Sequence, residues 1–322
     1  MADNKSLLTI QHGNTLFSPP IVEGVEIEWE RTGSPGKLTF TTIKIPDAGM
    51  NFEEGDAVCF YYDKTPLFMG YVFSKSRDKK QQIKVTCYDQ IRYLKNKYSY
   101  VFEKKTATQI IKALCKDFNI KTGTMEDTKY VIPAIAEENT AALDIILSTL
   151  EDTLTNTGNM FTLYDDFGKL TLKDSSKMMV GVLIDEESAE NYDYSSNIDD
   201  ETYNEIVLYY KDDNNKITPY AASNKEKIQQ WGTLRYFEEV KTPSIGKNKA
   251  NQLLSLYCRK KRELKVNDAF GSTLVRAGCL VPVKLDLGDI TTNNYMLVEK
   301  VTHKFNHDKY TMDLTLEGAW EK

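Results

Sequence analysis

Histidines are the first residues to test for chemistry, because they serve as metal ligands and as general bases near neutral pH. The chain has three, at His12, His303 and His307. The pattern predicts a strand around His303 and a turn around His307, and no third ligand follows at metal-site spacing. We expect a structural role for His303, its ring on the strand face shared by Val301 and Phe305 and hydrogen-bonded inside or at an interface. A general base is the alternative interpretation.

Nucleophilic and paired-carboxylate catalysis have no specific signature in this sequence. No Gly-x-Ser-x-Gly elbow occurs, so a Ser-His-Asp set would have to use one of the three histidines. Two carboxylate pairs, Asp165 with Asp166 and Asp212 with Asp213, fall in predicted hairpin turns, where Asp is favoured for backbone reasons. A glycosidase would instead need two carboxylates facing each other across a cleft. We therefore predict no catalytic residue and no enzyme activity.

Phosphate-binding and metal-binding motifs are also missing. Residues 33–37, Gly-Ser-Pro-Gly-Lys, invite a phosphate-loop interpretation, but Arg31 stands where a Walker A motif needs glycine, and a strand follows instead of a helix. A hairpin turn is the better prediction. The cysteines are scattered without a Cys-x-x-Cys pair, so we expect buried free thiols, with no disulfide framework, metal or cofactor. They are Cys59, Cys87, Cys115, Cys258 and Cys279.

Residues 259–262, Arg-Lys-Lys-Arg, form the strongest basic cluster. The pattern places them in the last turn of a helix, where cations complement the helix dipole. We expect a solvated helix end or a protein interface, with nucleic-acid contact as the alternative. The net charge of -6 argues against a dedicated nucleic-acid binder, because phosphate contacts normally leave a basic excess. No sequence-specific nucleic-acid binding is expected.

Length and composition predict a multidomain globular chain. The 322 residues are 41% hydrophobic and 11% aromatic, which suits two or three domains with substantial cores and a high strand content. Residues 1–8 are polar, and no apolar run approaches the roughly 18 residues that span a bilayer. We expect no membrane association and synthesis in the bacterial cytoplasm.

Strand patterns dominate the beginning of the chain. Residues 25–29 and 38–43 predict a hairpin, and three more strands are predicted at 57–62, 67–73 and 82–87. Strands at this spacing are typical of a small barrel or sandwich.

The middle of the chain changes to a mixed pattern. Thr106 and Gln109 have capping-box form before a helical stripe, and a second helix is predicted from about Thr140 until Gly158 stops it. A strand pair over 160–172 completes an α/β unit. Residues 180–200 are interpreted as a linker between domains.

The last part of the chain returns to strands and carries one long helix. The ladder that closes the chain alternates clearly, with Tyr310, Met312, Leu314 and Leu316 on one face. The predicted elements are strands at 204–211, 217–221 and 232–240, a short helical segment at 225–230, a helix at 244–262, and strands at 281–283, 295–305 and 310–317. The predicted fold class is α+β, dominated by β-structure, with β domains at 1–100 and 201–322 separated by an α/β domain at 101–200.

The order of these patterns resembles bacteriophage tail hub proteins of the XkdQ/YqbQ-like family over nearly the whole chain. Each motif is a strand-and-turn pattern, and their succession carries the resemblance. The motifs are residues 33–40, 54–58, 67–72, 166–170, 276–278, 299–305 and 310–314.

The resemblance implies a mechanical role in a phage tail or a tail-like bacteriocin, with no catalysis. Hubs of this type are homotrimers in which each chain supplies two similar tube-type β-barrels, so that three chains imitate a six-fold ring. Such a ring would join a hexameric tail tube to a trimeric spike. The implied partners are the tube protein, the spike protein, a baseplate wedge or adaptor protein, and the tape measure protein.

Two other functions are compatible with the sequence. A cell-wall hydrolase of the tail tip would need a carboxylate or histidine whose replacement abolishes peptidoglycan release. A module that binds cell-surface carbohydrate would need an exposed aromatic platform. The hub predicts large subunit interfaces instead.

Overall fold

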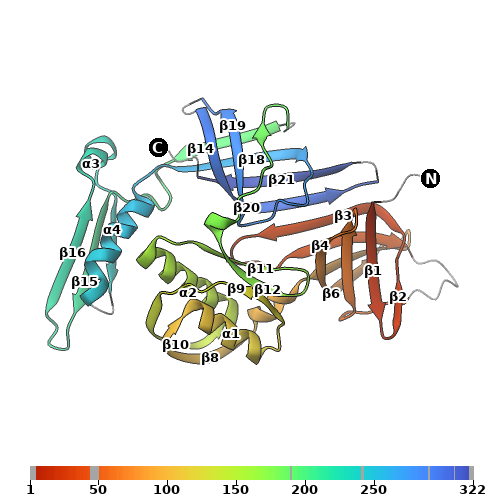
Figure 1. Cartoon of the computed structure of the whole chain (residues 1–322), viewed down its shortest axis with the longest axis horizontal. Coiled ribbons are helices and arrows are strands. Elements are labelled where there is room, and N and C mark those ends of the chain that lie inside the picture. The colour runs from red at the N-terminus through yellow and green to blue at the C-terminus, as the bar shows by residue number, and fades with distance from the viewer. Residues whose placement is uncertain are drawn as a thin grey trace.

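The computed structural model describes residues 5–43, 51–188, 191–240, 243–288, 291–307 and 309–318. The molecule is elongated, with the N-terminal strands at one end and a small sheet beside helix α4 (Gly246–Tyr257) at the other (Figure 1). Strands dominate, as the predicted α+β class requires. Within these residues no helix is long and apolar enough to cross a membrane.

The N-terminal strands form one half of a large sheet, in the order β3-β4-β7-β6-β5-β1-β2. The predicted hairpin and the three strands after it are confirmed. Alternating apolar side chains such as Ile27, Phe40 and Phe60 face a common core. The strands are β1 (Ser6–His12), β2 (Thr15–Phe17), β3 (Ile21–Glu30), β4 (Lys37–Ile43), β5 (Ala57–Tyr62), β6 (Thr65–Arg77) and β7 (Gln82–Tyr88).

The C-terminal strands form the second half of the same sheet. Strand β20 joins the halves, because one of its edges pairs first with β19 and then, from Lys300 to Phe305, with β3. The alternation predicted for the closing ladder is confirmed, with Met312, Leu314 and Leu316 buried. The strands are β13 (Ile184–Asp185), β14 (Asn191–Asn197), β18 (Lys261–Phe270), β19 (Leu280–Asp286), β20 (Thr291–Phe305) and β21 (Tyr310–Glu317).

The two halves share one topology. The order β3-β4-β7-β6-β5 corresponds to β14-β18-β21-β20-β19, the strands occur in the same chain order, and every neighbouring pair is antiparallel. The register also shifts at matching places, between Val72 and Ser74 and between Val298 and Lys300. Each half packs around its own hydrophobic core. The chain therefore contains the same strand arrangement twice.

The two closed barrels expected from the resemblance are not confirmed. Among the described strands, β2 and β14 end the sheet, and no pairing closes either half into a ring. In the first half, a cavity of about 150 Å³ separates β1 from β3 and is lined by residues that include Leu8 and Val25. In the second half, the Tyr192 hydroxyl of β14 donates to the Asp286 carbonyl at the end of β19, at 3.2 Å. Each half therefore has a gap between two strands at which backbone pairing stops.

The middle unit packs two helices against short sheets around a third core. The predicted capping box is confirmed, because the Thr106 hydroxyl accepts from the Gln109 amide at 3.3 Å while the Gln109 side chain accepts from the Thr106 amide at 3.1 Å. Gly158 ends α2 in the left-handed region, as predicted. The β8–β10 ladder was not predicted. The elements are η1 (Gln90–Lys95), β8 (Lys97–Thr106), α1 (Ala107–Asp117), β9 (Thr122–Met125), β10 (Val131–Ala141), α2 (Ala142–Thr157), β11 (Phe161–Asp165), β12 (Leu170–Asp174) and η2 (Ser175–Lys177).

A small unit with its own core is inserted between β14 and β18. Helix α4 packs on its three-stranded sheet, and Ile206, Leu208 and Leu253 are buried between them. The elements are β15 (Glu205–Lys211), β16 (Ile217–Ser223), α3 (Lys225–Trp231), β17 (Arg235–Glu239), η3 (Pro243–Ile245) and α4.

Two predictions in this region are wrong. The helix predicted over 244–262 ends at Tyr257, because residues from Lys261 onward pair with β14 and β21 as strand β18. The basic cluster at 259–262 therefore does not form a last helical turn. The linker predicted at 180–200 contains strand β14, whose residues 191–197 pair with β18 along their whole length.

Candidate functional site

Two of the histidines, His12 and His303, lie on different halves of the large sheet. The ring of His12 lies 2.8 Å from Asp56 on the first half, and His303 lies inside the second half. Within the described part of the chain, no three His, Cys, Asp or Glu side chains are grouped to hold a metal ion. All five cysteines are free, as predicted, although Cys59 and Cys258 are only partly buried.

His303 has the structural environment that the sequence predicts. Its side chain is buried, with Nε2 3.0 Å from the Val275 carbonyl and Nδ1 2.9 Å from the Tyr310 hydroxyl. A carbonyl can only accept, so Nε2 carries the proton and Nδ1 accepts from the hydroxyl. Burial and the nearby Arg276 lower the pKa of His303 to about 4. The ring is therefore neutral at physiological pH, and it connects β20 and β21 to the loop before β19.

The most elaborate polar site is the junction where the first half, the second half and the middle unit meet around Arg276. Its guanidinium lies 3.8 Å from the Tyr164 ring centroid and 5.4 Å from that of Trp29. Nη2 donates to the Asp165 carbonyl at 2.9 Å, and Nη1 lies 3.8 Å from Asp166. One side chain of the second half thus contacts both other units through aromatic, hydrogen-bond and ionic interactions.

Two buried carboxylates lie beneath this junction. Asp89 accepts from the Gly36 amide at 2.8 Å and from the Ile91 amide at 2.9 Å, one bond to each oxygen. Asp165 accepts from the Gly168 amide at 2.6 Å and from the Gln90 side chain at 3.1 Å. Burial raises the pKa of both carboxyls, the charge of Asp165 adds to the shift at Asp89, and the donors and Arg276 oppose it.

Glycines allow the units to approach closely at this junction. Gly278 has a φ of +87°, and a Cβ there would lie 2.3 Å from the Thr162 side chain. Gly168, with a φ of +81°, turns the β11–β12 hairpin against Met69 of β6, whose sulfur would lie 2.5 Å from a Cβ. The hairpin turn predicted around Asp165 and Asp166 is present, and it serves as a contact between units.

These contacts hold the geometry of the junction. Every oxygen of the two buried carboxylates already accepts a hydrogen bond from the protein. Asp89 and Trp29 were not singled out from the sequence, and Arg276 was noted only as part of the motif at 276–278. Isolated residues far apart in a chain have no periodic pattern, and only the fold brings them together.

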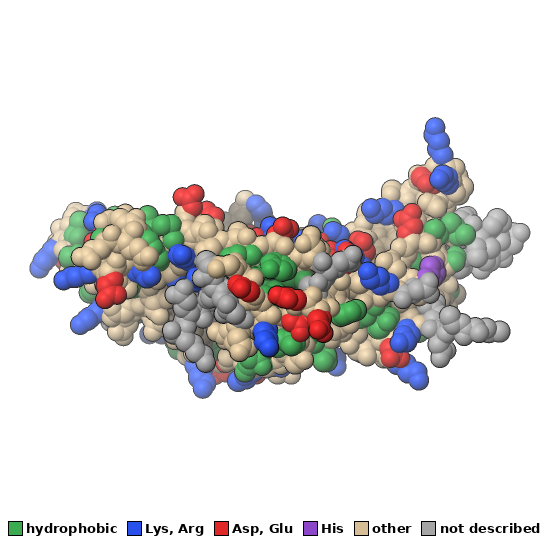
Figure 2. Space-filling model, turned by 90° about the horizontal axis from the view of Figure 1, so that it is seen from above, with side chains coloured by type: hydrophobic (Ala, Val, Ile, Leu, Met, Phe, Trp, Pro, Cys, Tyr) green, Lys and Arg blue, Asp and Glu red, His purple; other side chains and the backbone are tan. Residues whose placement is uncertain are grey.

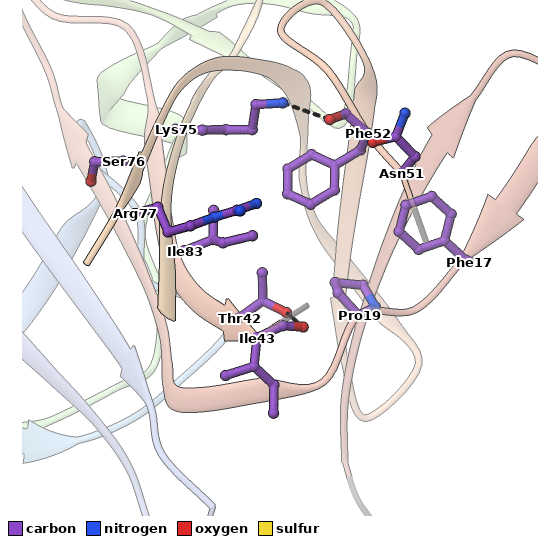
Figure 3. A pocket seen from close by; sticks show the side chains of 10 residues that line it. All are labelled: Phe17, Pro19, Thr42, Ile43, Asn51, Phe52, Lys75, Ser76, Arg77 and Ile83. Atoms are coloured by element: carbon purple, nitrogen blue, oxygen red, sulfur yellow. Dashed lines mark hydrogen bonds between the residues drawn. The ribbon is translucent and has the colours of Figure 1, made fainter. Parts of the chain in front are cut away.

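The pocket in Figure 3 lies at the open end of the first half and measures about 130 Å³. Phe17, Phe52 and Ile83 line it together with Lys75, which donates to the Phe52 carbonyl at 2.6 Å. Its volume is below the roughly 300–1,000 Å³ of typical ligand pockets.

The basic cluster lies in an ion-paired groove. Acidic residues that include Glu151, Glu299 and Glu317 line the same groove, and Arg262 is buried with its Nε donating to the Tyr194 hydroxyl at 3.2 Å. Acidic and basic side chains are also mixed over the face in Figure 2, without a large patch of one sign. This distribution does not favour nucleic-acid binding.

Comparison with known proteins agrees with this geometry. The structure superposes on the 43 kDa tail protein of prophage MuSo2 from Shewanella oneidensis with a TM-score of 0.72 at 15% identity, covering 96% of this chain and 98% of that one. It superposes on the E. coli c3393 protein, a type VI secretion component described as similar to the T4 tail proteins gp27 and gp5, with a TM-score of 0.59 at 11% identity, covering 98% and 77%. The chain thus has the fold of phage tail proteins.

The chain belongs to the YqbQ-like family, whose model matches residues 25–317. It is 31% identical over 305 residues to the phage-like element PBSX protein XkdQ of Bacillus subtilis, covering 91% of both chains. The family resemblance inferred from the order of strand motifs is confirmed.

Proposed function

We propose that the protein is a structural, non-enzymatic tail hub. In this role three copies form a ring of pseudo-six-fold symmetry that joins the hexameric tail tube to the trimeric spike. The repeated strand arrangement carries the proposal, because three chains with two equivalent halves present six similar units. The c3393 fold supports it, since that protein is described as similar to the T4 tail proteins gp27 and gp5.

The arrangement of the remaining structure is compatible with a ring. In Figure 1 the middle unit lies below the large sheet and the inserted unit lies beyond its left end, so neither unit extends the strand order that joins the two halves. We propose the division 1–100, 101–200 and 201–322 as the hub's working parts, with β13 and β14 of the middle range completing the sheet of the last part. We also propose that each half completes a barrel on assembly. Partners would be the tube, spike, wedge or adaptor, and tape measure proteins of a phage tail or bacteriocin.

The first test is the mass of the purified chain, alone and with the spike protein of its own particle. A trimer supports the hub, and a monomer under both conditions contradicts it. A peptidoglycan-release assay addresses the enzyme alternative: release that is lost in Asp165→Asn would overturn the non-enzymatic role.

A further inference from the structure

Strand β20 shows how one half of the sheet receives a strand from the other. Its first part pairs with β19 through Leu297, and after the register shift its last part pairs with β3, from Lys300 opposite Glu30 to Phe305 opposite Val25. An ion pair of 2.9 Å between Lys300 and Glu28 reinforces this junction. The same edge of one strand therefore has two successive partners.

The equivalent strand of the first half, β6, has only the first of these partners. Its pairing with β5 extends to Tyr71 opposite Ala57. Past the matching register shift, residues 74–77 pair with β7 on one edge, and the described chain provides no strand on the other. Ser74, Ser76 and Arg77 are exposed, whereas their counterparts Lys300 and Thr302 are half-buried and His303 is buried.

Strand β14 is the equivalent of β3, and one of its edges also has no strand partner among the described residues. It pairs with β18 on one edge and ends the sheet on the other, within the described residues. Ser195 and Ser196 are exposed. The strands β18, β21, β20, β3, β4 and β7 separate β14 from β6, so one copy cannot pair the two edges with each other (Figure 1).

We infer that residues 74–77 of β6 in one copy pair antiparallel with β14 of a second copy, repeating between chains the β20–β3 junction within the chain. This inference rests on the proposed hub and identifies its subunit contact. A contact between two different surfaces joins copies head to tail and closes into a ring when the rotation fits. It would also cover two sheet edges that have no strand partner among the described residues, and such edges otherwise favour aggregation.

The register follows from the repeat. Val72 pairs with Cys87 as Val298 pairs with Leu316, so Arg77 corresponds to His303. Across the next strands of the first half, Cys87 pairs with Leu38, and Leu38 pairs with Ile27. In the second half, Leu316 pairs with Leu264, and Leu264 pairs with Tyr194. Ile27 therefore corresponds to Tyr194.

His303 pairs with Ile27, so Arg77 is placed opposite Tyr194. Continuing antiparallel, Ser76 faces Ser195 and Lys75 faces Ser196. These pairs contain no like charges, and an arginine beside a tyrosine ring is a favourable contact.

Cysteine pairs test this register in the full chain. We expect Ser76→Cys with Ser195→Cys, or Lys75→Cys with Ser196→Cys, to give covalent trimers on a non-reducing gel after mild oxidation, with the linked peptides identified by mass spectrometry. Both pairs are needed, because hydrogen-bonded and non-hydrogen-bonded positions alternate along a ladder. The control is Ser76→Cys with Ser196→Cys, which a one-residue slip places on opposite faces. The wild-type chain shows the background from the native thiols.

The outcomes distinguish failure of the β6–β14 pairing from failure of the proposed hub. A trimer in which neither in-register pair cross-links, or in which only the slipped pair does, overturns the β6–β14 pairing while the proposed hub stands. A monomer, alone and with the spike protein, overturns both. Covalent trimers from an in-register pair, absent from the control, establish the contact.

Discussion

Replacing Arg276 with methionine should loosen the junction between the three units. The change removes a charged hydrogen bond to the Asp165 carbonyl, worth about 1.5–3 kcal/mol, and contacts with the rings of Tyr164 and Trp29, worth about 0.5–2 kcal/mol. Only 22% of the Arg276 side chain is exposed, so solvent screens these interactions only weakly. We expect a loss of about 2–5 kcal/mol in the free energy of unfolding.

The assay is urea unfolding followed by tryptophan fluorescence, to which Trp29 at the junction contributes as one of the chain's three tryptophans. Arg235→Met is the matched control, because Arg235 makes an exposed ion pair with Glu205 within the inserted unit. Exposed pairs of this kind contribute about 0–1 kcal/mol. Equal losses in Arg276→Met and Arg235→Met would refute the argument that Arg276 holds the units together.

Three further predictions concern other parts of this framework. Gly168→Ala should destabilise the chain by about 1–3 kcal/mol in thermal unfolding, since the residue combines a positive φ with close approach to Met69; an unchanged melting temperature would contradict it. Thr106→Ala should cost about 1 kcal/mol through the lost cap of α1, whereas Thr106→Ser should be nearly neutral by the same measurement. The pKa of His303 is about 4 in the folded chain and higher when unfolded, so its neutral form stabilises the fold above about pH 6.5, and this contribution is lost as the pH falls toward 4. The stability difference between wild type and His303→Gln should therefore shrink over that range, and a constant difference would show that His303 does not titrate as described.

The sequence predicts local elements well where a local pattern specifies them. The alternation over 310–317, the capping box at Thr106 and the stop at Gly158 depend on neighbours within a few residues, and each is confirmed. The helix over 244–262 was predicted too long, because Lys261 and Arg262 suit a helix end as well as a strand. Pairing with β14 and β21 decides between them, and that information is not local.

The junction around Arg276 and the repeated topology could not be derived from local patterns. Trp29, Asp89, Asp165 and Arg276 come from four separated segments, so their contacts exist only once the units are packed. The equivalence of β14 with β3 was obscured by the inserted unit, which separates β14 from β18 in the sequence. The tyrosines at 192 and 194, spaced by two, are the signal that could have identified β14 as a strand.

Class averages of the purified assembly, viewed along its symmetry axis, would show directly whether the two β halves of each chain line a common ring. We expect three copies around a channel with a six-fold outline, each copy contributing both β halves to the wall. A single copy, or a ring whose two halves lie away from the channel, would contradict it.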